Sequence, residues 1–258
     1  MTKLTIIKVG GQIVEESESL KRLLADFAAI EGLKLLVHGG GRAATNVAKQ
    51  LGIETQMVNG RRITDLAMLE VVTMVYGGLV NKRIVAGLQA LGVNALGLTG
   101  ADLNCIFAEK RPVTDVDYGF VGDVKKVNAK ALSDLLSANI IPVIAPLTHD
   151  GNGNLLNTNA DTIAGETAKA LAQYFDVKLF FCFEKKGVLL DENDDENVIS
   201  KLNFEEYKKL VDKKIITGGM MPKIENSFNA LQNGVKQVFI TRADLFRTEG
   251  GTEIVVNG

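Results

Sequence analysis

The sequence predicts an α/β fold, a three-layer αβα sandwich around a mainly parallel, open β-sheet. Two observations lead to this prediction. Short apolar stretches of strand length alternate along the chain with segments whose apolar residues recur every three or four positions, the spacing of one helix face. The connections between them are short and often rich in glycine. Such an alternation is typical of parallel strands joined by helices that cover both faces of the sheet.

Strands are expected where a short apolar run is bounded by glycine, proline or polar residues. In chain order, the expected strands cover residues 4–9, 33–38, 95–98, 105–108, 119–127, 140–145, 177–183, 238–241 and 253–256. The stretch from residue 93 to residue 127 combines short strands with turns and contains Pro112. We therefore expect a hairpin-rich elaboration in that part of the chain.

Helices are expected where the apolar residues recur at helical spacing, and some of them begin at a residue that can cap a helix. They cover residues 20–30, 44–51, 66–91, 128–137, 159–175, 204–211 and 222–232. A polar loop at residues 52–64 precedes the longest of them, which Thr64 or Asp65 is expected to cap, and Asn128 is expected to cap the next.

The composition excludes several classes of protein. Of the 258 residues, 46% are hydrophobic and 23% are charged, which is typical of a globular protein. The 29 Lys and Arg nearly balance the 31 Asp and Glu, so the chain lacks the charge excess expected of a protein that binds nucleic acid or an anionic membrane. No apolar run approaches the roughly 18 residues that span a bilayer. We expect neither a nucleic-acid partner nor a membrane partner.

The cysteines and histidines are too few and too dispersed to predict a metal site. Cys105 and Cys182 lie in apolar surroundings, and the two histidines, His38 and His149, do not share a metal-binding spacing with them. Buried free thiols are typical of a reducing compartment. We therefore expect a cytoplasmic protein without a metal ligand of its own.

Two glycine clusters follow the first two expected strands, at Gly10-Gly11 and at Gly39-Gly40-Gly41. Backbone N–H groups without a Cβ beside them can face a phosphate or a carboxylate. The second cluster also fits the G-x-G-x-x-A form of a dinucleotide-binding turn. That motif requires an acidic residue about 20 positions later. The corresponding loop at residues 56–62 is basic, which argues against a dinucleotide.

Three further positions carry polar side chains at the expected strand ends and helix starts. Lys8 lies in an apolar strand, where a buried lysine requires a charged partner. Asn157, Asn159 and Asp161 precede a helix, and capping explains only one of the three. Lys223 lies in the first turn of a helix, where a cation needs an anionic partner such as phosphate.

Six motifs then carry a resemblance to a known family. They are Ile7-Lys8-Val9-Gly10-Gly11, His38-Gly39-Gly40-Gly41, Asn59-Gly60-Arg61-Arg62-Ile63-Thr64, Gly119-Phe120-Val121-Gly122, Asn157-Thr158-Asn159-Ala160-Asp161 and Gly218-Gly219-Met220-Met221-Pro222-Lys223. In this order and spacing, the sequence resembles the N-acetylglutamate kinases of the amino acid kinase family over nearly its whole length.

The resemblance implies a single amino acid kinase domain over residues 1–258, with a lobe at 1–175 that binds the acylated amino acid and a lobe at 176–258 that binds ATP. It implies that the γ-phosphoryl group of ATP, accompanied by Mg²⁺, is transferred to the side-chain carboxylate of N-acetyl-L-glutamate in the second step of arginine biosynthesis. The first strand begins at the start of the chain, without the extra N-terminal helix of arginine-inhibited, hexameric relatives. That difference implies a homodimer insensitive to arginine.

The resemblance also assigns roles to residues. Lys8 and Lys223 are expected to approach the transferred phosphoryl group from two sides, with Asp161 holding both ammonium groups. The residues expected to bind the acylated glutamate are Gly40, Gly41, Arg62, Asn157 and Asn159. The residues expected to bind ATP are Gly10, Gly11, Glu184, Lys185, Lys186, Gly187, Val188, Leu189, Ile215, Ile216 and Thr217. No protein side chain is expected to ligate the metal.

Two departures from the family's pattern leave open the contacts to adenine, in the first case, and the acyl group, in the second. After the strand at 177–183, where the family usually has Ser or Thr and then Asp, the chain has Phe183-Glu184-Lys185-Lys186-Gly187. The segment at 99–104 lacks the family's usual glycine after Asp102. A kinase for N-succinylglutamate or for an N-acyl-aminoadipate is therefore an alternative. A non-catalytic amino-acid and nucleotide sensor is an alternative of another class, and the three charged residues Lys8, Asp161 and Lys223 argue against it.

Overall fold

The structure is a computed structural model that describes residues 1–58, 60–191 and 194–256. Its strands are β1 (Lys3–Val9), β2 (Leu33–His38), β3 (Met57–Val58), β4 (Arg61–Arg62), β5 (Ala95–Leu98), β6 (Ile106–Lys110), β7 (Gly122–Val127), β8 (Ile141–Ile144), β9 (Leu147–His149), β10 (Leu155–Asn157), β11 (Asp176–Phe183), β12 (Lys201–Leu202), β13 (Gln237–Arg242) and β14 (Thr252–Ile254).

Its α-helices are α1 (Gly11–Glu15), α2 (Ser17–Ala28), α3 (Gly41–Gln50), α4 (Leu66–Val72), α5 (Asn81–Ala90), α6 (Ala129–Ser137), α7 (Ala160–Leu171), α8 (Phe204–Asp212) and α9 (Met220–Gln232). A π-helix, η1 (Thr73–Val80), joins α4 to α5, and two short 3₁₀ helices are η2 (Asp102–Asn104) and η3 (Phe246–Thr248).

The main sheet has the strand order β12-β14-β13-β11-β1-β2-β8-β5. Its neighbouring strands run parallel, except that β13 and β14 are antiparallel. This arrangement confirms the predicted α/β fold with a mainly parallel, open sheet. Strands β1 and β11 lie at its centre, so the first strand of the chain pairs directly with a strand from its last third.

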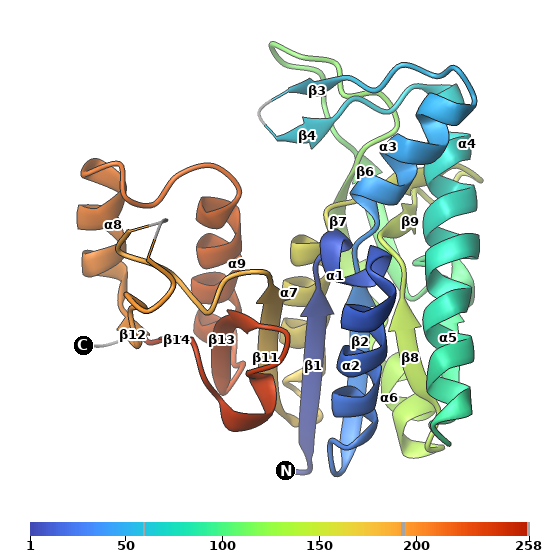
Figure 1. The fold of residues 1–258 in the computed structure, drawn as a ribbon. Coiled ribbons are helices and arrows are strands. Elements are labelled where there is room, and N and C mark those ends of the chain that lie inside the picture. The colour runs from blue at the N-terminus through green and yellow to red at the C-terminus, as the bar shows by residue number, and fades with distance from the viewer. Residues whose placement is uncertain (59, 192–193, 257–258) are drawn as a thin grey trace.

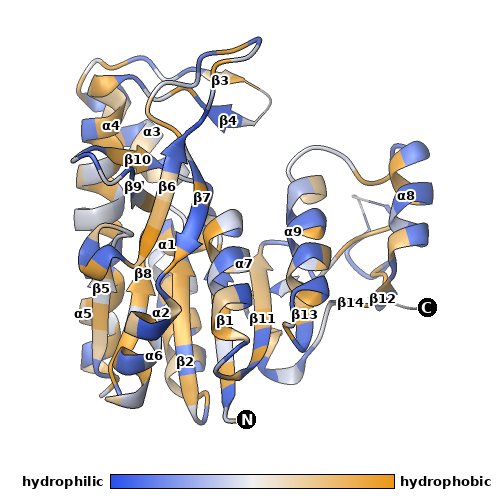
Figure 2. Cartoon of the chain, turned by 180° about the vertical axis from the view of Figure 1, so that it is seen from behind, coloured by the Kyte–Doolittle hydropathy of each residue, from blue (hydrophilic) through white to orange (hydrophobic). Residues whose placement is uncertain are grey.

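Helices cover both faces of this sheet and complete the three layers (Figure 1). One face packs on α1 to α5 through a core that includes Ile7 and Val9 of β1. The other packs on α6 to α9 through a core that includes Leu4 and Ile6. Alternate residues of a strand point to opposite faces. Lys8 therefore shares the face of Leu4 and Ile6, the face covered by α7 and α9. Figure 2 shows the hydrophobic residues concentrated on the strands between these layers.

A second sheet, of order β10-β9-β6-β7, and the two-stranded hairpin β3–β4 lie at the end of the main sheet where β1 and β2 terminate (Figure 1). The antiparallel pair β6–β7 confirms part of the hairpin-rich elaboration expected at residues 93–127, whereas β5, at the start of that stretch, pairs with β8 in the main sheet. The sequence did not predict β9 and β10, and it described residues 52–64 as a polar loop although β3 and β4 form there. These strands are two or three residues long, too short to show an apolar periodicity.

The long helix predicted at residues 66–91 is helical throughout but is not a uniform α-helix, because η1 occupies its middle. Asp65 is the cap, since its side chain accepts a hydrogen bond from the Met68 backbone N–H. Within the described residues, Leu66–Ala90 is the one helix long and apolar enough on average to span a membrane, although Glu70 and Lys82 interrupt its apolar runs. Its buried face belongs to the core against the sheet, which explains its apolar character.

Candidate active site

The two glycine loops lie against each other at the carboxyl ends of β1 and β2. A Cβ on Gly39 would lie 3.0 Å from the backbone nitrogen of Gly11, and one on Gly11 would lie 3.3 Å from that of Gly41. The Gly10 N–H donates to the Cys182 carbonyl at 3.1 Å and the Gly39 N–H to the Val9 carbonyl at 2.9 Å. Glycine is needed here because the two backbones touch, and the Gly10 N–H is not available to a phosphate.

Beside these loops, Asp161 lies between two lysines. Lys8 Nζ is 2.8 Å from Asp161 Oδ1, and Lys223 Nζ donates a hydrogen bond to Asp161 Oδ2 at 2.9 Å. All three side chains are nearly buried, with 9% of Lys8 and 11% of the other two exposed. The chain thus brings together three residues that are far apart in sequence and that were expected to act together.

Burial and charge act against each other in this cluster. Burial alone raises the pKa of Asp161, but the charges of Lys8 and Lys223 outweigh it and hold that pKa well below its usual range. Burial lowers the pKa of Lys8, an effect that Asp161 opposes and the nearby Lys223 charge reinforces. Asp161 is therefore ionised at neutral pH, and it is the main group that favours the charged form of Lys8.

Local structure explains how each member of the cluster is placed. Asp161 lies in the first turn of α7, where the helix dipole favours a negative charge. The Asn159 side chain caps the same helix by accepting hydrogen bonds from the Asp161 and Thr162 backbone N–H groups. Lys223 lies in the first turn of α9, an unfavourable place for a cation, and Asp161 supplies the anionic partner that the sequence required.

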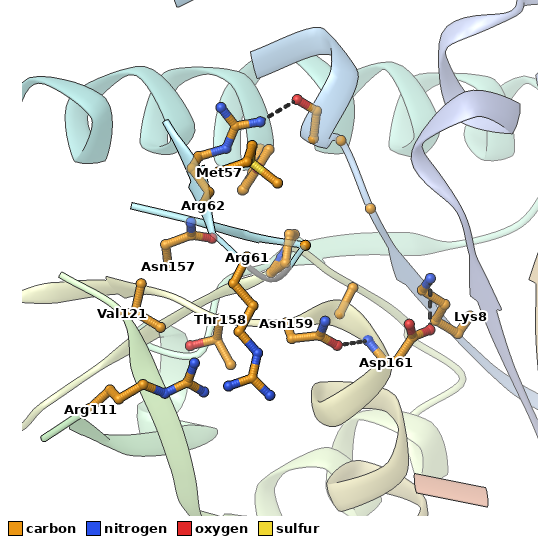
Figure 3. A pocket seen from close by; sticks show the side chains of 17 residues that line it. Lys8, Met57, Arg61, Arg62, Arg111, Val121, Asn157, Thr158, Asn159 and Asp161 are labelled. Atoms are coloured by element: carbon orange, nitrogen blue, oxygen red, sulfur yellow. Dashed lines mark hydrogen bonds and ion pairs between the residues drawn. The ribbon is translucent and has the colours of Figure 1, made fainter. Parts of the chain in front are cut away.

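A first pocket of about 240 Å³ opens on one side of the cluster (Figure 3). The residues expected to bind an acylated glutamate, together with Lys8 and Asp161, are all in its lining. The lining consists of Lys8, Gly39, Gly40, Gly41, Met57, Gly60, Arg61, Arg62, Tyr76, Arg111, Val121, Pro146, Asn157, Thr158, Asn159, Ala160 and Asp161. Asn59, which begins one of the sequence motifs, lies outside the described residues.

Arg62 is held in place by neutral oxygen atoms at the edge of this pocket. Its Nη2 donates to the Gly41 carbonyl and to Thr45 Oγ1, each at 2.8 Å, and its Nη1 donates to Thr55 Oγ1 at 3.3 Å. Asn157 donates to Thr64 Oγ1 at 2.9 Å. The guanidinium has no carboxylate partner among the ion pairs of the described residues, so its charge remains available to an anion.

The lining also includes residues to which the sequence gave no role, among them Arg61, Tyr76, Arg111 and Val121. A signal existed for Arg61 and Val121, because both lie inside family motifs. Tyr76 looks like any other apolar residue of a long helix, and its ring occupies the space that a Cβ on Gly40 would need, at 2.9 Å. Arg111 follows a short strand and shows no pattern of its own.

A second pocket of about 620 Å³ lies on the other side of the cluster. Of the residues expected to bind ATP, it is lined by Gly10, Glu184, Lys185, Gly187, Val188, Leu189, Ile215, Ile216 and Thr217, together with Phe183, Lys8 and Lys223. Gly11 and Lys186 are outside this lining. Lys8 is common to both pockets, so the charged cluster lies where the two meet.

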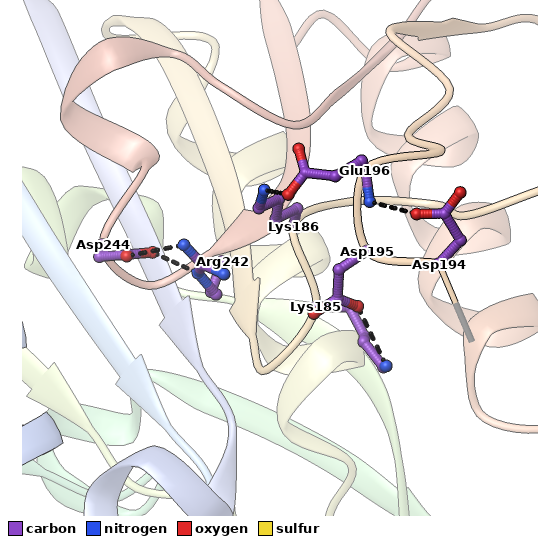
Figure 4. A network of polar contacts seen from close by, with 7 residues as sticks. All are labelled: Lys185, Lys186, Asp194, Asp195, Glu196, Arg242 and Asp244. Carbon is purple, nitrogen blue, oxygen red and sulfur yellow. Dashed lines mark hydrogen bonds and ion pairs between the residues drawn. The ribbon is translucent and has the colours of Figure 1, made fainter. Parts of the chain in front are cut away.

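Acidic residues pair with the two lysines that follow β11 (Figure 4). Lys186 pairs with Glu196, and Lys185 Nζ lies 3.1 Å from Asp195. Lys186 therefore already has an anionic partner, and it does not line the pocket that the sequence assigned to it. Lys185 lines the pocket while it contacts the acidic segment.

Neither metal ligation nor proton transfer by a histidine is indicated at this site. Within the part of the chain that the structure describes, no group of three or more His, Cys, Asp or Glu side chains could hold a metal ion. His38 is fully buried, and its two ring nitrogens contact the Gly39 carbonyl at 2.7 Å and Asn81 Nδ2 at 3.1 Å. Burial lowers the pKa of His38 to about 4, so the ring is neutral and structural at neutral pH.

Relatives of known name share most of this sequence. An acetylglutamate kinase from Phocaeicola vulgatus is 69% identical over 252 residues, which cover 98% of this chain and 98% of that protein. An acetylglutamate kinase from Bacteroides fragilis is 67% identical over 252 residues, with 98% and 97% covered.

Solved structures share the fold. The smu.665 protein from Streptococcus mutans superimposes with a TM-score of 0.83 at 29% identity, over 98% of this chain and 99% of that one. Carbamate kinase from Giardia lamblia bound to AMP-PNP has a TM-score of 0.71 at 14% identity over 99% of both chains, a likeness of fold alone. Residues 3–242 match the model of the amino acid kinase family. The chain therefore belongs to the amino acid kinase family.

Proposed function

We propose that the chain has acetylglutamate kinase activity, transferring the γ-phosphoryl group of ATP to the side-chain carboxylate of an N-acylated glutamate. The observation that carries this proposal is the cluster Lys8–Asp161–Lys223 at the meeting point of two pockets. A phosphoryl group passing from one pocket to the other would pass between the two ammonium groups. The names of the relatives that are 66–69% identical support the same activity.

The proposed reaction requires stabilisation of negative charge in the transition state, and it does not require a general base. An attacking carboxylate is already ionised, so no proton has to be removed from it. In the transition state, negative charge spreads over the phosphoryl oxygens. Lys8 and Lys223, preorganised by Asp161 in a nearly buried site, stabilise that charge without having to reorganise. The neutral His38 agrees with a reaction that uses no histidine base.

The smaller pocket is assigned to the acylated glutamate. We assign its α-carboxylate to Arg62 and Asn157, because a guanidinium binds a carboxylate through two parallel hydrogen bonds. Its side-chain carboxylate is assigned to the backbone of Gly40 and Gly41 beside Lys8. Asn159 lines the pocket with an amide whose oxygen is already used in capping α7, so only its NH₂ group is offered to the substrate.

The larger pocket is assigned to ATP, which accords with its greater volume and with AMP-PNP bound to the carbamate kinase of the same fold. We propose a substrate lobe at residues 1–175 and an ATP lobe at 176–258; the division is supported by the lining of the larger pocket, which comes from the second segment apart from Lys8 and Gly10. Mg²⁺ is expected to be held by the ATP phosphates, since the described residues offer no cluster of metal ligands.

We also propose that the protein is a homodimer in the cytoplasm. The buried free thiols Cys105 and Cys182 accord with a reducing compartment.

The test is an assay of ADP release with N-acetylglutamate, N-succinylglutamate and N-acetyl-aminoadipate, each with ATP and Mg²⁺. We expect turnover with an N-acylglutamate and acyl phosphate formation in amounts equal to the ADP released. Unacylated glutamate is the control for the acyl group. A folded protein that releases no ADP with any of these compounds would contradict the proposed activity.

A further inference from the structure

The smaller pocket contains more positive charge than N-acetylglutamate requires. Four cationic side chains, Lys8, Arg61, Arg62 and Arg111, line it, and the one carboxylate in this lining, Asp161, is already paired with lysines. N-acetylglutamate has two carboxylates. Under the assignments above, Lys8 meets one and Arg62 meets the other. Arg61 and Arg111 then remain without a substrate group to bind.

Arg111 is fixed in place with one donor unused. Its Nε and Nη2 bind the Asp123 carboxylate at 3.2 Å and 2.5 Å, and its guanidinium lies 5.5 Å from the centre of the Tyr118 ring. Its Nη1 is buried and makes no hydrogen bond. A donor of a charged group that is buried without a partner is destabilising. The lost hydrogen bond is recovered if a ligand oxygen enters the pocket at this point.

Arg61 is directed to the same part of the pocket. Figure 3 shows the guanidinium groups of Arg61 and Arg111 pointing to one end of the pocket, whereas Arg62 points to the opposite side, toward the loop of Gly41. Arg61 forms no ion pair with a carboxylate among the described residues. Two like charges directed into one space repel each other, and an anion between them removes that repulsion.

We propose that the acyl group of the substrate ends in a carboxylate, which Arg111 and Arg61 bind. The substrate class is thus an N-(carboxyacyl)glutamate, for which N-succinylglutamate is the probe. This inference rests on the proposed kinase function, since the α-carboxylate and the reacting carboxylate are placed by it. The methyl group of an acetyl substrate offers Arg111 Nη1 no acceptor, whereas a succinyl carboxylate offers two oxygens.

The experiment compares kcat/KM for three substrates: N-acetylglutamate, N-succinylglutamate and N-succinamylglutamate, in which an amide replaces the terminal carboxylate at nearly the same size. We expect kcat/KM for N-succinylglutamate to exceed that for each of the other two substrates by about tenfold or more, because a hydrogen bond to a charged group contributes about 1.5–3 kcal/mol. The succinamyl compound separates the effect of charge from that of length.

Variants then test the residues. In Arg111→Gln the ratio of kcat/KM for N-succinylglutamate to that for N-succinamylglutamate is expected to fall about tenfold, and in Arg61→Gln it falls by a smaller factor. Lys125→Gln is the matched control, because it removes one exposed cation on the neighbouring strand β7, outside the pocket, and should leave the ratio unchanged. Arg61 is exposed, so its variant remains informative even if Arg111→Gln does not fold.

Two failures are distinguishable. Absence of turnover with all three substrates contradicts the kinase function itself. The carboxyacyl inference is overturned if kcat/KM for N-acetylglutamate equals or exceeds that for N-succinylglutamate. It is also overturned if the ratio of kcat/KM for N-succinylglutamate to that for N-succinamylglutamate is the same in Arg111→Gln, Arg61→Gln and wild type. Either result leaves the kinase function intact.

Discussion

At the scale of single residues, the catalytic proposal depends on how one carboxylate affects two ammonium groups. Asp161 is nearly buried between Lys8 and Lys223, and without it the two lysines would face each other as uncompensated charges. Such a site is electrostatically costly, and it persists because each charge has a partner at 2.8–2.9 Å. The same arrangement directs two cations to the point at which the pockets meet.

Asp161→Asn should lower kcat by a factor on the order of 10², because it removes the charge that orients both lysines. It should also move the alkaline limb of the pH–rate profile to lower pH. Burial already lowers the pKa of Lys8, and the variant lacks the negative charge that opposes this effect. Steady-state kinetics between pH 6 and pH 10 provides the measurement. Asp134→Asn, which breaks the exposed pair with Lys130, is the matched control. An unchanged kcat and an unshifted limb would refute the role given to Asp161.

Arg62→Ala should raise KM for the acylated glutamate by about 10- to 100-fold and leave KM for ATP nearly unchanged, because the guanidinium lines only the substrate-side pocket. Initial rates with each reactant varied in turn distinguish the two effects. Arg83→Ala, which removes an exposed arginine on α5, serves as the control. A rise confined to KM for ATP would mean that Arg62 has been placed in the wrong pocket.

At the scale of elements, the turn after β11 decides which lysine faces the nucleotide. Residues 184–187 connect a central strand to the lining of the larger pocket. The adjacent side chains Lys185 and Lys186 contact different acidic residues, Asp195 and Glu196. Lys185 lines the pocket, and Lys186 pairs with Glu196 outside it.

Lys185→Met should therefore raise KM for ATP by about tenfold, the loss expected from one charge-assisted phosphate contact. Lys186→Met should change it by less than about twofold, because Lys186 does not line the pocket and already pairs with Glu196. The two variants control for each other, since they remove the same charge from adjacent positions. The measurement is KM for ATP at saturating N-acylglutamate. If the pocket assignment is wrong, Lys186→Met raises this KM more than Lys185→Met does.

At the scale of the whole molecule, stability is expected to depend on pH through His38. This ring is fully buried at the end of β2, between the Gly39 carbonyl and Asn81 of α5. Its pKa is lowered by burial to about 4 in the folded chain, against 6.5 for an ordinary histidine. Between those values the unfolded chain binds a proton that the folded chain does not. The free energy of unfolding therefore falls as the pH falls through this window.

The expected loss of unfolding free energy from this group is about 3 kcal/mol between pH 7 and pH 4. Asp161 does not contribute to it, because a carboxyl with a lowered pKa loses its stabilising effect only below its ordinary pKa of 3.8. Urea unfolding at pH 7 and at pH 4.5 should show a smaller difference in His38→Asn than in wild type. His149→Asn, in the second sheet, is the control. Equal pH dependence in all three proteins would exclude His38 as the cause.

Much of the fold followed from local patterns in the sequence. Residues 33–38 and 95–98 were predicted as strands with the bounds that the structure has, and Asn128 caps its helix as expected. These elements are apolar over several residues or begin at a capping side chain, and such signals are carried by neighbours in the chain. The short strands β3, β4, β9 and β10 were missed because two or three residues are too few to show an apolar periodicity, although each strand pairs with one close to it in the chain.

The candidate site was likewise predicted only in part from the sequence. Lys8, Asp161 and Lys223 could be selected from the sequence because each is a charge in an unexpected local setting, and the family motifs supplied the expectation that they act together. Only the tertiary structure decided that Asp161 lies between the lysines, that Lys186 faces an acidic segment, and that Arg111 enters the pocket with a free donor. These facts depend on distances between residues that are remote in the chain. A strand or helix pattern records which face of an element is buried, but it does not record which side chain from another element will meet it there.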